Sequence, residues 1–352
     1  MPERTQRPGE RSTGDRIYLL TGATGNLGSS LCRQLVAGGE RIRALVLRGD
    51  PAVQRVPEEA HVCLGDVLNV SSLDEFFSVP EHLDVYVIHC ASIVTLDPDY
   101  SQKVFDVNVT GTRNVLEQCV RHKVRRLVYI SSTSVIPELP DGEPIVEVSR
   151  FEPSRVVGYY AQTKAEATQL VMDAVNRHDL DASVVFPTGI FGPYDYGFGL
   201  ITSTIIQMVE GRIPVGVAGT FNCADVRDLA SGVISCCANG RKGEGYIMGN
   251  EIVTMQDLFD AISAASGCKR VTRILPTGVA RVAAALLGVI GKVTGWSTVL
   301  TGFTIYNLAR NNRFCSDKAI RELGYRFRPF AETIRDEVIW LREEGRIPAV
   351  GE

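Results

Sequence analysis

The chain has 352 residues, enough to bury a large core in one elaborated α/β domain or in two lobes. A formal net charge of −4 at pH 7 argues against a nucleic-acid partner, which requires a basic surface. The nine cysteines follow no disulfide framework, and neither Cys-x-x-Cys nor His-x-x-x-His spacing occurs. We therefore expect free thiols in the reducing environment of the cytoplasm, and no metal site.

Residues 1–15 are polar and lack the apolar core of a signal peptide, so we expect a disordered tail. The longest stretch that could be mistaken for a membrane segment, Val282–Gly291, has ten residues between two cations. A membrane-spanning helix needs about 20 apolar residues. We expect no membrane span.

Apolar runs alternate with helical spacing along the first half of the chain. Strands are expected at 17–21, 41–47, 60–64, 84–90, 125–131 and 181–186, and helices at 26–37, 71–77, 100–122 and 160–178. Strands that alternate with helices predict an α/β fold with a Rossmann-like, doubly wound parallel sheet.

The pattern loosens after Pro187, and only short elements return, around 226–238, 254–265 and 331–344. We assign residues 16–187 and 215–239 to a dinucleotide-binding domain. Residues 188–214 and 240–345 are assigned to a smaller, C-terminal substrate lobe.

A glycine cluster, Gly22-Ala-Thr24-Gly25-Asn26-Leu27-Gly28, follows the first strand and opens the first helix. Its glycines permit a tight turn, close approach of a pyrophosphate and close packing of helix on strand. The alternative is an ordinary glycine-rich turn. The position between a strand and a helix favours dinucleotide binding.

Tyr160 and Lys164 are four residues apart in an expected helix, so their side chains share one face. A nearby ammonium lowers the pKa of a phenol from about 10, which favours proton exchange near neutral pH. Tyr159 is out of register, because Thr163 lies four residues beyond it. The pair predicts an acid–base group, although such a spacing also arises by chance.

The Gly-x-x-Gly-x-x-Gly spacing of residues 22–28 resembles the extended short-chain dehydrogenases/reductases, the epimerase/dehydratase branch of that family. Over about residues 16–345, further segments match in order, and the chain is similar to dihydroflavonol reductases and 3β-hydroxysteroid dehydrogenases. Phe186 departs from the pattern, since many members carry arginine there, and this weakens the case for a nucleotide-sugar substrate. The matching segments are Gly65–Val67, His89–Ser92, Asn108–Asn114, Pro187–Pro193 and Leu323–Tyr325.

The resemblance assigns roles to individual residues. Family register selects Ser132, with Thr133 as the alternative, as the hydroxyl that orients the substrate oxygen beside Tyr160 and Lys164. Asn108 is a weaker candidate, since such a residue as often bonds backbone. The expected cofactor contacts are Gly22, Thr24, Gly25, Asn26, Leu27, Gly28, Asp66, Val67, Ala91, Ser92, Tyr160, Lys164, Pro187 and Ile190.

Arg48 bears on the choice of cofactor. It lies twenty residues beyond Gly28, where a carboxylate favours NAD and a cation favours the 2′-phosphate of NADP. A guanidinium can bind phosphate through two hydrogen bonds. We expect NADP, with NAD as the alternative if Asp50 reaches the ribose instead.

These features predict an NADP(H)-dependent oxidoreductase that interconverts a ketone or aldehyde and an alcohol on an apolar small molecule, such as a sterol, flavonoid or polyketide. One alternative is a nucleotide-sugar epimerase or dehydratase with tightly bound NAD, in which Arg227, Arg310 and Arg313 would grip a diphosphate. Another is a non-catalytic dinucleotide sensor. The apolar stretch Val279–Leu300 is interpreted as pocket wall, lobe core or the surface of a homodimer.

Overall fold

A computed structural model describes residues 15–282, 284 and 302–349. The expected tail, apart from Asp15, lies outside the described residues, as does most of the apolar stretch Val279–Leu300. Within the described ranges, no helix combines the length and the apolar character needed to cross a membrane.

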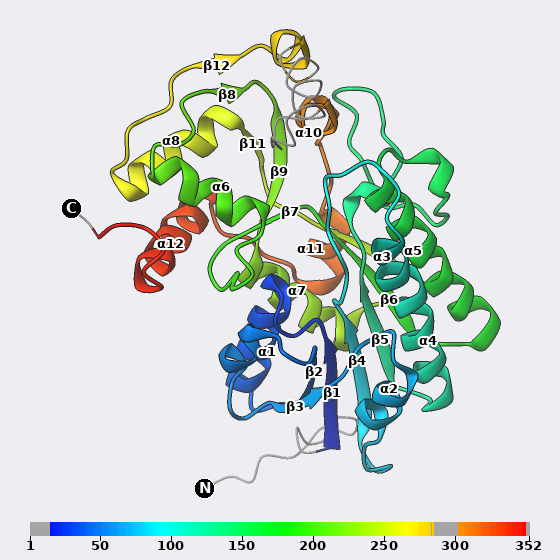
Figure 1. Ribbon diagram of the computed structural model, residues 1–352. Helices are drawn as coiled ribbons and strands as arrows, with labels where there is room; N and C mark the ends of the chain where they lie inside the picture. The colour runs from blue at the N-terminus through cyan, green and yellow to red at the C-terminus, as the bar shows by residue number, and fades with distance from the viewer. Residues whose placement is uncertain (1–14, 283, 285–301, 350–352) are drawn as a thin grey trace, which may run out of the picture.

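Seven parallel strands form the main sheet, in the order β3-β2-β1-β4-β5-β6-β10 (Figure 1). The first six are the strands expected from the sequence. The strand order reverses between β1 and β4, where open α/β sheets bind their ligands. The strands are β1 (Arg16–Thr21), β2 (Arg41–Val46), β3 (His61–Leu64), β4 (Asp84–His89), β5 (Arg126–Ile130), β6 (Ala182–Pro187) and β10 (Gly245–Met248).

Helices cover both faces of the sheet (Figure 1). Val87 and Tyr129 point into one apolar core, and Leu20 and Val128 into the other. Burial on both faces explains why the strands are apolar runs rather than alternating patterns. One face carries α2 (Val70–Phe77), α4 (Gly111–Arg121) and α5 (Tyr159–His178), and the other carries α1 (Asn26–Ala37), α7 (Val226–Asn239) and α11 (Asp317–Leu323).

The helix expected over 100–122 is interrupted. The chain forms α3 (Gln102–Phe105), one π-helical turn (Asp106–Thr110) and then α4. In the π turn, the amide of Gly111 bonds the carbonyl of Asp106, five residues earlier. Helical spacing in a sequence does not distinguish such a turn from a continuous helix.

The seventh strand corrects the expected domain boundary. The sequence pattern assigns 240–345 to the substrate lobe, but β10 pairs with β6, from Gly245 beside Val184 to Met248 beside Pro187. Helix α11 also returns to this domain and packs on α7 and β10. The physical reason is that β10 covers the open edge of β6, a long-range pairing that local composition does not mark.

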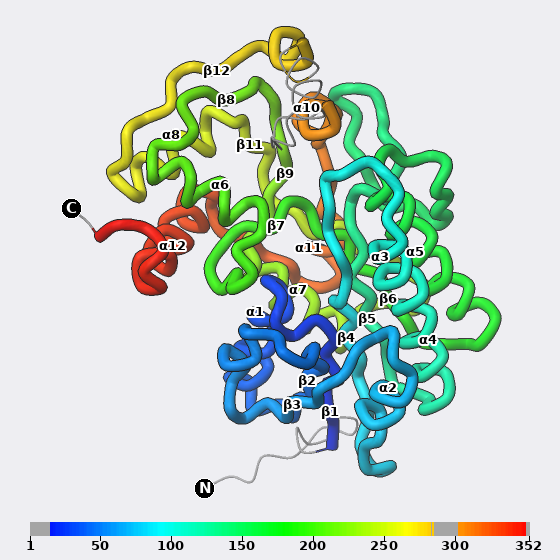
Figure 2. Tube along the Cα trace, in the orientation of Figure 1, coloured from blue at the N-terminus to red at the C-terminus, as the bar shows by residue number. Residues whose placement is uncertain are grey.

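The smaller lobe contains the sheets β11-β9-β7 and β12-β8. Figure 2 shows α6, α8 and α12 gathered on one side, where Phe259, Ile334 and Trp340 share an apolar core. Of segment 215–239, only α7 packs on the main sheet, whereas β8 and β9 belong to the lobe. The elements are β7 (Gly189–Phe191), α6 (Leu200–Val209), β8 (Gly216–Val217), β9 (Thr220–Asp225), β11 (Ile252–Thr254), α8 (Met255–Ser266), β12 (Ile274–Leu275), α10 (Gly302–Ala309) and α12 (Phe330–Glu343).

A buried carboxyl group joins α12 to the turn after β7. Glu337 has no exposed surface, and it accepts a hydrogen bond from the amide of Gly192 at 2.8 Å. Its other oxygen lies 3.2 Å from the hydroxyl of Thr202, which is also 2.8 Å from Asp195. That hydroxyl has one proton, so it satisfies both acids only if one of the two is protonated. Burial accordingly raises the pKa of Glu337 to about 8.

We expect Glu337→Gln to remove a pH dependence of stability. Because the folded pKa is raised, the contribution of Glu337 to stability is complete below the usual pKa of 4.5 and is lost as the pH rises towards about 8. Glutamine mimics the protonated acid. The free energy of unfolding of the variant should therefore rise relative to that of the wild type over this interval, by up to about 1.4 kcal/mol per pKa unit. Urea unfolding at both ends of the interval measures the change.

The control is Glu343→Gln, at an exposed position on the same helix. It should change stability little at either pH. An equal effect of Glu337→Gln at both ends of the interval would show that Glu337 does not titrate there.

Candidate active site

The turn between β1 and α1 brings backbone atoms closer than any side chain would allow. Gly22 has a φ of +69°, and a Cβ atom there would lie 2.7 Å from the amide nitrogen of Ala91. A Cβ atom on Gly28 would lie 2.0 Å from the carbonyl oxygen of Gly22. These two contacts require glycine and seat the turn on the end of β4.

The N-terminus of α1 faces this turn without a side-chain cap. Gly25 precedes the helix, so the first amides keep free donors of the kind that bind phosphate. The side-chain oxygen of Asn26 is buried and has no hydrogen-bond partner in the described part of the chain. Leu27 is buried, and Thr24 donates to Asp50 at 2.7 Å. An uncapped helix and an unpaired amide oxygen fit a ligand that brings both phosphates and hydroxyl groups.

Arg48 lies exposed just beyond β2, at the same edge of the sheet. With the residues that the structure describes it forms no hydrogen bond and no ion pair. The competing residue, Asp50, has both carboxylate oxygens engaged, one by Thr24 and the other by the amide of Ala52 at 2.9 Å. Of the two candidates for the ribose position, Arg48 is the one without a partner among the described residues, whereas Asp50 is already held by two hydrogen bonds.

Four of the expected cofactor contacts, Asp66, Val67, Ala91 and Ser92, follow β3 and β4. The Asp66 carboxylate accepts a backbone hydrogen bond in the turn after β3. Val67 is buried, and its carbonyl accepts from Asn114 at 2.9 Å. Ala91 contacts the glycine turn, and Ser92, which follows it, is half-buried. The structure thus brings these residues to the same sheet edge as the glycine turn.

The serine-rich end of β5 separates its hydroxyl groups by burial. Ser131 is buried and lies 2.7 Å from the hydroxyl of Thr168, while Thr133 is buried and donates to the carbonyl of Pro187 at 3.2 Å. Ser132 is half-buried, and its oxygen accepts from the amide and hydroxyl of Ser134, at 3.2 and 3.0 Å. Ser132 is therefore better placed than Thr133 to reach a ligand.

Tyr160, in the first turn of α5, meets Ser132. Burial raises the pKa of Tyr160 to about 12, and a hydrogen bond with Ser132 opposes that rise. The sequence predicts a pKa lowered by Lys164, but in the structure desolvation dominates and raises the pKa of Tyr160. Tyr160 is consequently a protonated phenol at neutral pH.

Lys164 lies one turn further along α5 and is almost fully buried. Its Nζ donates to the carbonyl of Ile130 at 2.7 Å and lies 4.5 Å above the ring of Tyr129. Burial lowers the pKa of Lys164 to about 7, against the opposing effect of nearby Cys90. Few buried amines remain this close to a change of charge at neutral pH, and such groups concentrate at functional sites.

The second lobe closes the site from the other side. Pro187 ends β6, and Ile190 in β7 pairs with Ala224 of β9, so the loop beside the expected nicotinamide joins the two domains. A Cβ atom on Gly158, next to the first residue of α5, would lie 2.5 Å from the ring of Phe303. Sequence reasoning missed Phe303, because nothing local marks a contact across so long a separation.

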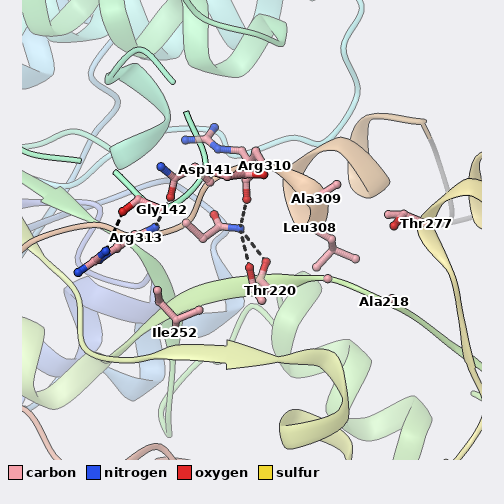
Figure 3. A pocket seen from close by; sticks show the side chains of 13 residues that line it. Asp141, Gly142, Ala218, Thr220, Ile252, Thr277, Leu308, Ala309, Arg310 and Arg313 are labelled. Atoms are coloured by element: carbon pink, nitrogen blue, oxygen red, sulfur yellow. Dashed lines mark hydrogen bonds between the residues drawn. The ribbon is translucent and has the colours of Figure 1, made fainter. Parts of the chain in front are cut away.

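A cavity of about 480 Å³ is lined by other residues than those of this site (Figure 3). Arg310 and Arg313 line it, together with Thr220, but Ser132 and Tyr160 do not. Arg310 lies 5.7 Å from the ring of Phe314, and Arg313 donates to the carbonyl of Gly142. The third arginine considered for a diphosphate, Arg227, is engaged by Asp225 and Asp336. The three arginines therefore do not form one anion site.

The glycine turn generates a direct test. We expect Gly28→Ala to weaken binding of NADPH and NADH at least tenfold, because the new methyl group overlaps the carbonyl of Gly22. Gly38→Ala, at the other end of α1, is the control: Gly38 has helical φ and ψ, and its Cβ would meet no atom closer than 3.4 Å. Nucleotide fluorescence measures binding, and circular dichroism checks the fold. Equal affinities in the two variants would contradict the role of the turn.

Comparisons with known proteins agree with this geometry. The chain is 29% identical over 334 residues to sterol demethylase protein B of Methylococcus capsulatus, covering 94% of this chain and 99% of that protein. It is 27% identical over 340 residues to a putative dihydroflavonol 4-reductase of Synechocystis, covering 94% and 96%.

The crystal structure of gox2253 matches with a TM-score of 0.81 and 28% identity, over 94% of this chain and 99% of that one. The model of the NAD dependent epimerase/dehydratase family matches residues 18–274. The seven-stranded Rossmann-like sheet and the glycine turn are thus those of the extended short-chain dehydrogenases/reductases. The reductases and dehydrogenases among the relatives support an NAD(P)-dependent oxidoreductase. This protein is a member of the NAD dependent epimerase/dehydratase family.

Proposed function

We propose that this protein uses NADP(H) to interconvert a ketone or aldehyde and an alcohol on an apolar small molecule. The observation that carries the proposal is the proximity of the half-buried Ser132 hydroxyl to the protonated phenol of Tyr160, at the sheet edge that also holds the glycine turn. A positioned acid beside a second hydroxyl is what reduction of a carbonyl requires.

The glycine turn, Tyr160 and Ser132 have distinct roles in this reaction. Gly22, Gly25 and Gly28 would hold the pyrophosphate against the N-terminus of α1, and a bound nicotinamide cofactor would supply the hydride for the carbonyl carbon. Tyr160 donates its phenolic proton to the carbonyl oxygen, while Ser132 donates a hydrogen bond that orients that oxygen. The product is an alcohol, and the reverse direction oxidises one.

Lys164 acts on Tyr160 and on the cofactor. It is one helical turn from Tyr160 on the same face, and its Nζ has two further donors beyond the bond to Ile130. In its charged form it favours the phenolate left after proton donation, and its spare donors suit the hydroxyl groups of the nicotinamide ribose. The low pKa lets the ammonium change charge near neutral pH.

The preference for NADP rests on Arg48. Its guanidinium is exposed, has no acidic partner in the described chain, and follows β2, where the adenosine ribose binds in this fold. Asp50, which would favour NAD, is engaged by Thr24 and Ala52. A free guanidinium and an occupied carboxylate favour a 2′-phosphate over a 2′-hydroxyl.

We expect Arg48→Ala to raise the KM for NADPH selectively. Loss of a charge-assisted hydrogen bond costs about 1.5–3 kcal/mol, or roughly 10- to 150-fold in affinity. The KM for NADH should change little. Arg41→Ala, at the exposed opposite end of β2, is the control for general loss of positive charge. Equal increases in both KM values would assign the preference elsewhere.

The walls near Tyr160 favour an apolar substrate. Phe303 packs against Gly158, and its ring stacks on that of Tyr306, with centroids 6.3 Å apart. Val157, beside Gly158, is 52% exposed. The names of two relatives, a sterol demethylase and a dihydroflavonol reductase, suggest a polycyclic scaffold of this character.

A nucleotide-sugar epimerase or dehydratase is the second candidate, and the family match and the pair of arginines in the cavity of Figure 3 favour it. Phe186 and the engaged Arg227 weigh against it. Assays of purified protein with ketones and with nucleotide sugars separate the two. Tightly bound NAD together with turnover of a nucleotide sugar would replace the proposal above.

We expect Tyr160→Phe to lower turnover at least 10²-fold, because a positioned acid contributes about 10²–10⁴-fold. The ring and its packing remain, so NADPH should still bind. Tyr159→Phe is the matched control: its hydroxyl is buried without a partner among the described residues, and its ring packs on Tyr100. Turnover of Tyr160→Phe above about a tenth of the wild-type value would contradict the mechanism.

A further inference from the structure

A row of polar side chains crosses the otherwise apolar interior beneath the catalytic edge of the sheet. Thr21 ends β1, His89 ends β4, and Thr112 lies in the first turn of α4. All three are at most 1% exposed. The hydroxyl of Thr21 is 2.6 Å from His89 Nδ1, and the hydroxyl of Thr112 is 3.1 Å from His89 Nε2.

Backbone groups at both ends fix the direction of every bond in this row. The hydroxyl of Thr112 donates to the carbonyl of Asn108 at 2.7 Å, because a carbonyl can only accept. Its oxygen is then free to accept from His89 Nε2–H, which leaves Nδ1 to accept from Thr21. The oxygen of Thr21 in turn accepts from the amide of Ala91 at 3.2 Å. One tautomer of a neutral His89 therefore satisfies the whole row.

The Ala91 end of the row touches the cofactor site. The amide of Ala91 is the group against which the turn at Gly22 is seated. A change in the Thr21 hydroxyl therefore acts on the residue that supports the glycine turn.

The other end reaches the catalytic helix through Asn108, whose carbonyl lies in the π turn. The Asn108 side-chain amide bonds both backbone groups of Ile93 and donates to Thr163 at 3.1 Å. Thr163 donates to the carbonyl of Tyr160 at 2.8 Å. Asn108 is 1% and Thr163 2% exposed, so water cannot replace a lost partner.

We infer that His89 is a positioning residue, which holds the helical turn that carries Tyr160 in register with the glycine turn through the hydrogen-bonded row Thr21–His89–Thr112–Asn108–Thr163. A phenylalanine would fill the same space in this layer, where the ring of Tyr129 already packs against His89 at 5.6 Å. An imidazole adds one acceptor and one donor on opposite sides, as the two threonines require. The inference rests on the proposed function for its consequence, the placement of Tyr160.

The first test is spectroscopic and needs no substrate. Long-range ¹H–¹⁵N spectra of the protein, with its five histidines, identify His89 by the signal that disappears in His89→Gln. We expect a neutral ring with its proton on Nε2 and no titration around pH 6.5, the ordinary pKa of histidine. Burial lowers the pKa of His89 to about 3, with a smaller effect from Lys164, the charged group that faces it. A ring that titrates near pH 6.5, or a proton on Nδ1, would overturn the inference.

The second test separates the two ends of the row. Thr112→Val breaks it on the Tyr160 side, so kcat should fall about tenfold with little change in the Kd for NADPH. Thr21→Val breaks it on the side of the glycine turn, so the Kd should rise instead. Thr112→Ser and Thr21→Ser keep the hydroxyl groups and should restore both values. A purely structural role would lower the midpoint of thermal unfolding without this split.

Identical effects of the two valine variants, or no rescue by serine, would contradict the positioning role. Circular dichroism at the assay temperature excludes unfolding as the cause, and the more conservative serine variants cover the case in which a valine variant does not fold. If the wild-type protein turns over no carbonyl compound, the proposed function fails. The tautomer of His89 and the effect of Thr21→Val on NADPH binding still decide whether the row exists and supports the glycine turn.

Discussion

The contact between Gly28 and the carbonyl of Gly22 is the constraint on which the site depends. It presses the start of α1 against the end of β1, and it leaves the first amides of the helix open instead of capped. The same turn rests on Ala91, at the point where the strand order reverses between β1 and β4. The turn therefore lies at the point of the sheet where strand order reverses, which is where open α/β sheets bind their ligands.

Three buried ionisable side chains each connect two or more secondary-structure elements through hydrogen bonds. Lys164 joins α5 to the end of β5, His89 joins β4 to the elements on either side, and Glu337 joins α12 to the turn after β7. Burial shifts the pKa of each group towards its neutral form. A neutral group avoids most of the cost of a buried charge while it keeps the directionality of its hydrogen bonds.

The two lobes are interleaved rather than consecutive. The chain leaves the main sheet after β6, builds part of the lobe, returns through α7 and β10, and returns again through α11. Phe303 reaches Gly158 from the lobe, while β7 continues directly from β6 towards β9. The lobe therefore contacts the protein at the strand that follows β6 and at the start of α5, the helix that carries Tyr160.

The sequence by itself determined the first six strands, the glycine turn and the Tyr160–Lys164 register, because each is a local pattern of a few residues. It also placed Ser132 at a strand end, where hydroxyl groups meet ligands. Only the tertiary structure decided that Thr133 is engaged by Pro187, that Asp50 is engaged by Thr24, and that β10 belongs to the main sheet. It likewise decided the direction of the Tyr160 pKa shift, since desolvation depends on every element packed around the phenol. These features depend on partners that are far away in the chain. A local pattern of residues does not show which side chains a long-range contact will bury or hydrogen-bond.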